Sequence, residues 1–188
     1  MAYKYLFFDD YSEGAHPRIL EALTRTNMQQ EVGYVKDSFA IEATKLIKDK
    51  IDNPAADIHF VSSGTHANLV CLSFLLKPYE SVIAADTGHI NLHETGAIEA
   101  TGHKINIAAP VNGKLTPEAI QQIVEFHNFD QMVKPRAVYI SQSTEVGTVY
   151  SRKELEEISK ICKQHELYLY IDGARLGAAL TLKMQIWI

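Results

Sequence analysis

The chain has 188 residues, of which 46% are hydrophobic and 22% charged, and this suits one large domain with a substantial buried core. The formal net charge is −5 and no run of lysine and arginine occurs, which argues against a nucleic-acid partner. No apolar stretch reaches the roughly 18 residues of a membrane span, and the one at the N-terminus is too short for a signal peptide. The two cysteines, Cys71 and Cys162, belong to no ligand motif, so we expect a reduced, cytoplasmic protein without a membrane partner.

The first part of the chain is expected to be helical and to lie outside any sheet. Pro17 suits the first turn of a helix, and Ser38 is the expected N-cap of a second helix that ends before Pro54. We therefore expect residues 1–50 to form an N-terminal helical arm, and residues 51–188 to form a partial large domain.

Strand and helix patterns alternate through the rest of the chain. Short apolar runs predict strands at residues 58–61, 81–85, 104–108, 137–141 and 167–171. Helical spacing predicts helices over residues 67–76, after Thr116 and after Ser151, where Glu154 completes a capping box. Repeated strand–helix–strand units indicate an α/β fold, a three-layer, mostly parallel sheet with helices on both faces. Ligands of such sheets bind beyond the carboxyl ends of the strands, where polar segments lie at residues 62–65, 86–89 and 172–175.

The first of these segments, Ser63-Gly64-Thr65, has the composition of a phosphate site. It lies between a predicted strand and a predicted helix, and a helix N-terminus offers unpaired N–H groups and partial positive charge. Gly64 permits close approach of the backbone, and the two hydroxyl groups add donors. The alternative is that Ser63 or Thr65 only caps the helix. Neither GxxxxGK[ST] nor GxGxxG is present, so the segment is not a nucleotide-binding loop of either kind.

Asp172 ends the apolar run Leu167–Ile171 and is a candidate partner for a positively charged group. An ionised carboxylate at the end of a buried strand needs a partner, and a protonated pyridine nitrogen is one such group. Arg175 is another partner, or it binds a substrate carboxylate through two parallel hydrogen bonds. The alternative role for Asp172 is a loop cap or an ordinary ion pair.

His89 follows a predicted strand by four residues. A neutral imidazole can stack on a pyridine ring or relay protons, although a histidine in a surface loop is the ordinary alternative. His89 and His93 are also spaced as two metal ligands on a helix would be. No third ligand is evident and HExxH is absent, so no metal is predicted.

The ordered set formed by these three segments resembles the threonine aldolase and β-eliminating lyase family, from about Phe8 to Leu180. The resemblance implies a pyridoxal 5'-phosphate enzyme of the aminotransferase-like fold. It assigns the cofactor phosphate to Ser63, Gly64 and Thr65, ring stacking to His89, the pyridine nitrogen to Asp172, and the substrate carboxylate to Arg175. His89 and Asp172 would be the catalytic residues.

The same resemblance implies retro-aldol cleavage of a small β-hydroxy-α-amino acid to glycine and an aldehyde, by a homodimer or homotetramer. The chain departs from the family at two segments. Ser141-Gln142-Ser143-Thr144-Glu145 stands in the loop where the family usually has a histidine, and Asp9-Asp10-Tyr11-Ser12 differs from its usual Arg-Ser-Asp-Thr. These departures bear on the substrate more than on the cofactor.

The Schiff-base lysine of the family lies at the end of the strand that follows the strand of Asp172. Lys183 is the only lysine after Asp172, and the ten residues between them are fewer than the dozen or more that a parallel crossover takes. We therefore expect a truncated chain that stops before this lysine and lacks the C-terminal small domain. A non-catalytic remnant that binds the cofactor or a partner subunit without turnover is the alternative. A nucleotide-binding domain is disfavoured, because a glycine-rich phosphate loop is missing.

Overall fold

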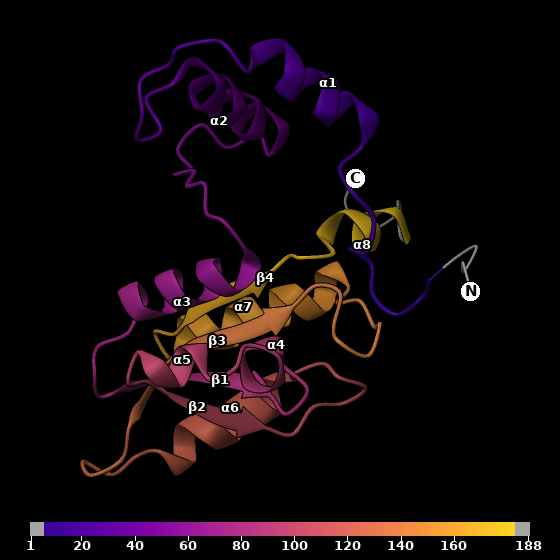
Figure 1. Ribbon diagram of the computed structural model, residues 1–188. Helices are drawn as coiled ribbons and strands as arrows, with labels where there is room; N and C mark the ends of the chain where they lie inside the picture. The colour runs from indigo at the N-terminus through magenta and orange to yellow at the C-terminus, as the bar shows by residue number, and fades with distance from the viewer. Residues whose placement is uncertain (1–5, 183–188) are drawn as a thin grey trace. The chain divides into compact units, whose positions relative to one another are not determined.

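The computed structural model describes residues 6–182, and the chain divides into two compact units, residues 1–60 and 61–188 (Figure 1). The first unit contains α1 (Pro17–Thr26) and α2 (Ser38–Lys50). None of its described residues is buried, and apolar side chains such as Leu20 and Leu23 are more than half exposed. Two helices of this length have too little apolar surface between them to form a core of their own.

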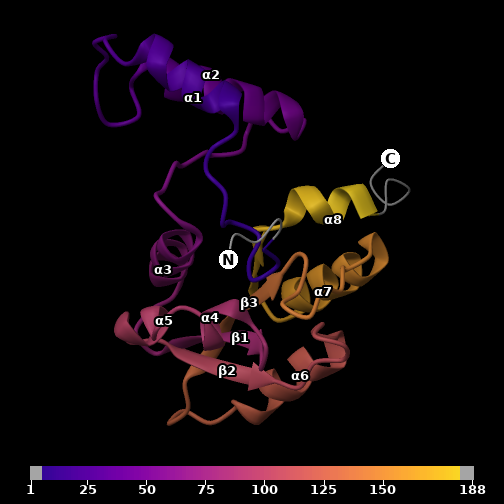
Figure 2. The same ribbon diagram turned by 45° about the vertical axis from the view of Figure 1, so that its right-hand side comes forward.

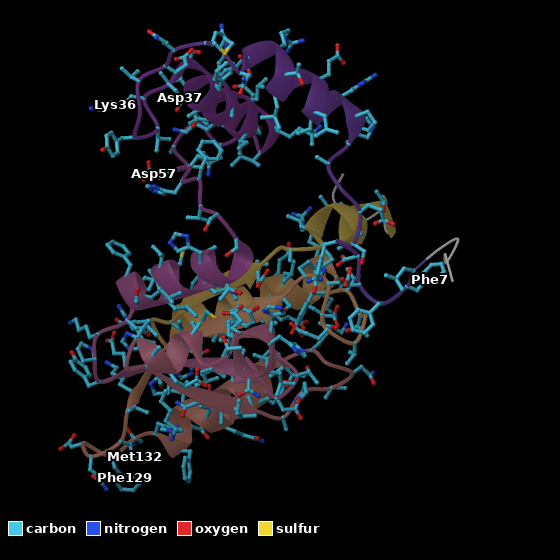
Figure 3. All side chains as sticks on the ribbon, viewed as in Figure 1. Phe7, Lys36, Asp37, Asp57, Phe129 and Met132 are labelled. Carbon is cyan, nitrogen blue, oxygen red and sulfur yellow. The ribbon has the colours of Figure 1, made fainter. Side chains whose placement is uncertain are left out.

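The cap of α2 differs from the prediction. Asp37, which is labelled in Figure 3, is the N-cap in place of Ser38. Its backbone is extended, and its carboxylate accepts a hydrogen bond from the N–H of Ala40 at 2.8 Å. Ser38 is already helical, and its hydroxyl donates to Glu31 instead. Both residue types are favoured caps, so the local pattern alone does not separate them.

The second unit is built on a four-stranded parallel sheet. Its strands are β1 (Glu80–Ala85), β2 (Lys104–Ala108), β3 (Lys134–Ser141) and β4 (Tyr168–Asp172), and their order is β2-β1-β3-β4. The predicted strand at 58–61 is wrong, because these residues form no strand and pair with no described one. An apolar run that finds no neighbour to complete its backbone hydrogen bonds does not become a strand.

Helices cover both faces of the sheet, as predicted. On one face lie α3 (Gly64–Leu75), α4 (His89–Leu92) and α5 (Ala97–Ala100), and on the other lie α6 (Pro117–Phe126) and α7 (Arg152–Gln164) (Figure 2). The capping box that opens α7 is present, with Ser151 and Glu154 each bonding the backbone of the other. The last described helix, α8 (Leu176–Leu182), follows β4.

Alternate residues of the central strand β1 belong to two separate cores. Val82 and Ala84 pack with α3, α4 and α5, whereas Ile83 and Ala85 pack with α6 and α7. Burial on both faces explains why the strand reads as a continuous apolar run and not as an alternating one. The three-layer α/β prediction is therefore confirmed.

The strand that ends at Asp172 is less buried than the sequence predicted. In the described sheet, β4 is an outer strand next to β3, and Tyr168 and Ile171 are each more than 40% exposed. The backbone N–H of Gln142, just beyond β3, donates to the carbonyl of Asp172 at 2.8 Å and ties the two strand ends together. Asp172 itself is half-buried.

Among the described residues, no helix is long and apolar enough to cross a membrane. The prediction about Lys183 concerns a residue that lies outside the described part of the chain.

Candidate active site

The carboxyl ends of β1, β3 and β4 meet at one edge of the sheet, because the three strands are parallel neighbours. Two of the three predicted segments, residues 86–89 and 172–175, lie at this edge. Polar side chains from α3 and from the segment between α4 and α5 join them there. The result is a connected cluster that links His89 to Asp172.

Among the described residues, Tyr139, Asn68 and Ala174 donate hydrogen bonds to the carboxylate of Asp172. The hydroxyl of Tyr139 donates to Oδ2 at 2.7 Å, the side-chain amide of Asn68 donates to the same oxygen at 3.1 Å, and the backbone N–H of Ala174 donates to Oδ1 at 3.0 Å. The sequence suggested Arg175 or a pyridinium as the partner, but it did not suggest a phenol or an amide. The alternative role as a loop cap is also realised, since the bond to Ala174 is of that kind.

Asn68 lies at the centre of the cluster and is 1% exposed. Its Nδ2 donates to Glu94 at 2.6 Å as well as to Asp172, and its Oδ1 accepts from the hydroxyl of Tyr170 at 2.7 Å. The two carboxylates can only accept, so the amide nitrogen must face them both. Asn68 therefore uses both ends of its amide.

Two tyrosines on neighbouring strands support this arrangement. Tyr139 and Tyr170 are register partners, and their rings stack with centroids 5.7 Å apart. Burial, followed by the charge of Asp172, raises the pKa of Tyr139. Burial, followed by the nearby Cys71 and Asp172, raises the pKa of Tyr170. Both hydroxyls therefore keep their protons and act as donors at neutral pH.

His89 is the first residue of α4 and is held at two points. Its ring Nδ1 lies 2.8 Å from Oε1 of Glu94, and its backbone N–H donates to Oε1 of Glu145 at 2.9 Å. Ser141 donates to the same Glu145 oxygen. The segment after β3, where the family usually has a histidine, thus supplies a carboxylate that anchors the main chain of His89.

Two side-chain oxygens at this edge of the sheet are buried without a described partner. They are Oε2 of Glu94 and Oγ1 of Thr87, the residue two positions before His89. Buried polar atoms are nearly always paired in native proteins, so such atoms point to a missing water or ligand. His89, Glu94 and Asp172 also form a group whose ligand atoms lie within 4.8 Å of one another. His93, the other half of the spacing noted in the sequence, does not belong to this group.

Ser63, Gly64 and Thr65 lie at the N-terminus of α3, one turn before Asn68. Ser63 is the N-cap, and its Oγ accepts from the N–H of His66 at 3.1 Å, so the capping alternative holds for this residue. Its hydroxyl proton remains a donor. A Cβ added to Gly64 would meet nothing within 4 Å, so its backbone borders open space. Within the described residues, the N–H groups of Gly64 and Thr65 have no hydrogen-bond partner.

Arg175 is half-buried and lies in the turn between β4 and α8. Its backbone carbonyl accepts from the N–H of Ala179 at 3.0 Å and begins the first turn of that helix. It thus stays three residues from Asp172, at the same edge of the sheet. Its role as a substrate ligand remains a prediction.

Four residues of the cluster were missed in the sequence: Asn68, Glu94, Tyr139 and Tyr170. A weak signal existed for Asn68, which is a strongly polar residue in an otherwise apolar stretch of α3. The two tyrosines read as apolar strand residues, and nothing local distinguishes Glu94 from a surface carboxylate. Glu94 also contacts His89, five residues away, but the other hydrogen bonds of these residues within the cluster span 26 to 104 positions along the chain.

The fold and the cluster define an α/β protein with connected polar side chains at the carboxyl edge of a parallel sheet. A family model described as "Beta-eliminating lyase" matches residues 9–186, and the chain belongs to this family. The predicted resemblance is confirmed. The chain is 36% identical over 173 residues to a low specificity L-threonine aldolase of Pseudomonas aeruginosa, which covers 91% of this chain and 49% of that protein.

The chain is also similar to a solved threonine aldolase structure. A threonine aldolase of Leishmania major superposes with a TM-score of 0.89 at 50% identity, over 91% of this chain and 50% of that one. A PLP-bound C–S lyase from Staphylococcus hominis superposes with a TM-score of 0.60 at 14% identity, over 85% of this chain and 41% of that one, and this likeness concerns the fold alone. The chain spans about half the length of the relatives it matches.

Proposed function

We propose that this chain is the cofactor-binding part of a pyridoxal 5'-phosphate lyase that cleaves a small β-hydroxy-α-amino acid, as threonine aldolases do. The observation that carries the proposal is the hydrogen-bonded link between His89 and Asp172 at the carboxyl edge of the sheet. Residues 61–182 hold the whole of this link, and we propose them as the cofactor-binding unit. Kinship with the threonine aldolases of Pseudomonas aeruginosa and Leishmania major supports the reaction class.

The surroundings of Asp172 fit a pyridine nitrogen. The bonds from Tyr139, Asn68 and Ala174 do not by themselves fill the roughly four acceptor positions of a carboxylate. The three donors also orient the group. Asp172 would thus hold a proton on the ring nitrogen of the cofactor.

The N-terminus of α3 fits the phosphate group. The N–H groups of Gly64 and Thr65, the partial charge of the helix end and the hydroxyl of Ser63 all suit a dianion. Because Gly64 borders open space, an oxygen can approach its backbone closely. Asn68, one turn further along α3, ties this helix to the site of the ring.

When bound, pyridoxal 5'-phosphate supplies an electron sink for the carbanion that remains when the Cα–Cβ bond breaks. The chain's own residues would position the reactants around it. His89 would lie against the ring and exchange a proton at its imidazole, and Arg175 would bind the substrate carboxylate through its guanidinium. Buried Tyr139 and Asn68 would hold Asp172 in place during these steps.

Cofactor binding is tested by titrating the full chain with pyridoxal 5'-phosphate and following its absorbance and the melting temperature. We expect saturable binding that Asp172→Asn weakens by about tenfold or more. Asp130→Asn is the matched control, because it removes an exposed carboxylate from the loop between α6 and β3, outside the cluster, and it should bind like the wild type. Absence of binding by the wild-type chain would contradict the proposal.

Turnover is a separate test, with threonine as substrate and aldehyde release as the signal. If the chain binds the cofactor but releases no aldehyde, the result supports the proposed cofactor site and contradicts lyase activity of this chain. Borohydride reduction followed by peptide mapping identifies any lysine that bonds to the cofactor, including Lys183, on which the expectation of a truncated chain depends.

We also propose that the protein is a cytoplasmic homo-oligomer. The free thiols of Cys71 and Cys162 and the exposed apolar side chains of α1 and α2 support this assignment. Light scattering coupled to gel filtration measures the assembly, and a monomer at micromolar concentration would contradict it.

A further inference from the structure

Glu94 is a buried carboxylate whose position packing alone does not explain. Its side chain is 0% exposed, Oε1 contacts both Asn68 and His89, and Oε2 has no described partner. Burying a charge with one oxygen unpaired is costly, and a neutral glutamine could bridge the same two groups at lower cost. Oε1 is the atom that joins Asn68 to His89, and a role in holding both of these side chains explains why it is buried there.

The contact with His89 determines which ring nitrogen carries the proton. An ionised carboxylate only accepts, and it lies 2.8 Å from Nδ1, so Nδ1 must be the donor. In a neutral imidazole, Nε2 is then unprotonated and is an acceptor. Glu145 fixes the main chain of the same residue, so both the ring and the backbone of His89 are held.

Asn68 connects Glu94 to Asp172, the second residue proposed to contact the cofactor. Its amide nitrogen bonds Glu94 and Asp172, two carboxylates whose nearest ligand atoms are within 4.8 Å. Tyr170 fixes the other end of the amide. A shift of Glu94 would therefore disturb His89 directly and Asp172 through Asn68.

We propose that Glu94 is a positioning residue that keeps His89 in the tautomer protonated at Nδ1, with Nε2 as the free acceptor. The inference rests on the proposed function, in which His89 lies against the cofactor ring. An uncharged imidazole of fixed orientation suits stacking on an electron-poor ring, and its unprotonated Nε2 can accept a proton.

The tautomer is measured by ¹⁵N NMR on the full chain without cofactor, above the ordinary histidine pKa of about 6.5. His89→Gln assigns the signals. We expect Nδ1 to be protonated in the wild-type chain and the proton to move largely to Nε2 in Glu94→Met, whose thioether is only a weak acceptor. Glu94→Gln keeps an oxygen at the same place and should retain the wild-type tautomer.

The matched control is Glu99→Gln, which removes an exposed charge from α5 and should change neither signal. A wild-type proton on Nε2, or an unchanged spectrum in a folded Glu94→Met, would overturn the proposal. If circular dichroism shows that Glu94→Met is unfolded, Glu94→Asp takes its place. Its shorter side chain should shift the proton partly towards Nε2, and an unchanged spectrum would again overturn the proposal.

Cofactor affinity gives a second readout. We expect Glu94→Met to raise the dissociation constant of pyridoxal 5'-phosphate about tenfold, and Glu94→Gln to raise it much less. Equal affinities in the wild type and Glu94→Met would contradict the positioning role. If the wild-type chain binds no cofactor, the proposed function fails, while the NMR measurement still decides the role of Glu94.

Discussion

The hydroxyl of Tyr139 donates to Oδ2 of Asp172 across 2.7 Å, although the two residues are 33 positions apart. They lie on neighbouring parallel strands, and Asp172 is the register partner of Ser141, two residues beyond Tyr139. A side chain two residues back on a strand points to the same face of the sheet. The phenol of Tyr139 thus reaches the carboxylate of Asp172 on the same face of the sheet.

Removing this hydroxyl should weaken both the fold and the site. We expect Tyr139→Phe to lower the free energy of unfolding by about 1.5 kcal/mol, because a hydrogen bond to a charged group is lost while water can still reach half-buried Asp172. Urea unfolding measures the change. The affinity for pyridoxal 5'-phosphate should fall several-fold, and an unchanged affinity would show that Tyr139 does not tune the carboxylate.

Replacing Asn68 by aspartate tests the bridge between the two carboxylates. Asn68→Asp removes the shared donor and adds a third negative charge, so we expect a loss of about 3 kcal/mol at pH 8. Asn68→Leu removes the donor without adding charge and should cost less. Urea unfolding at pH 8 measures both losses. Equal losses in Asn68→Asp and Asn68→Leu would contradict the electrostatic explanation.

The lowered pKa of Glu154, in the first turn of α7, predicts that the stability of the fold depends on pH. Burial opposes its charge, yet hydrogen bonds from Lys114 and Ser151 lower its pKa to about 2, below the ordinary value of 4.5. A depressed pKa contributes stability that is present above the unfolded value and is lost as the pH falls towards 2. Since more than a third of the side chain is exposed, we expect Glu154→Gln to cost only about 0.5 kcal/mol at pH 7.

Urea unfolding of Glu154→Gln and the wild type should therefore converge between pH 4.5 and 2. Glu156→Gln is the matched control, because its pair with Arg152 is more than 60% exposed on both sides. This control should match the wild type throughout. A difference for Glu154→Gln that does not change with pH would assign the effect to the side-chain shape and not to the charge.

Gly88 leaves no room for a side chain in the turn before His89. A Cβ there would lie 3.0 Å from the carbonyl oxygen of Ala85 and 3.5 Å from the Cβ of Ala84. Because the first neighbour is backbone, Gly88→Ala must shift the turn, and we expect a loss of about 1–3 kcal/mol together with weaker cofactor binding. Gly177→Ala, with no atom within 4 Å, should be neutral or slightly stabilising. Thermal melting of both variants measures the contrast.

Local sequence patterns were sufficient to predict much of the fold. The strand at 81–85, the helix that begins after Thr116 and the capping box at Ser151 all depend on residues within one turn or one strand of each other. The strand at 58–61 failed, because a strand needs a partner as well as an apolar composition. Ser38 failed as a cap because Asp37 beside it is equally suited.

The sequence by itself determined the three-layer class and the polar strand ends at residues 86–89 and 172–175, since periodicity and strand–helix alternation are local properties. Only the tertiary structure decided that Asn68 and Glu94 join His89 to Asp172. That link depends on the strand order β2-β1-β3-β4 and on the packing of α3 and α4 against one face of the sheet. Contacts between residues up to 104 positions apart follow from how the chain folds back on itself, and no local pattern records them.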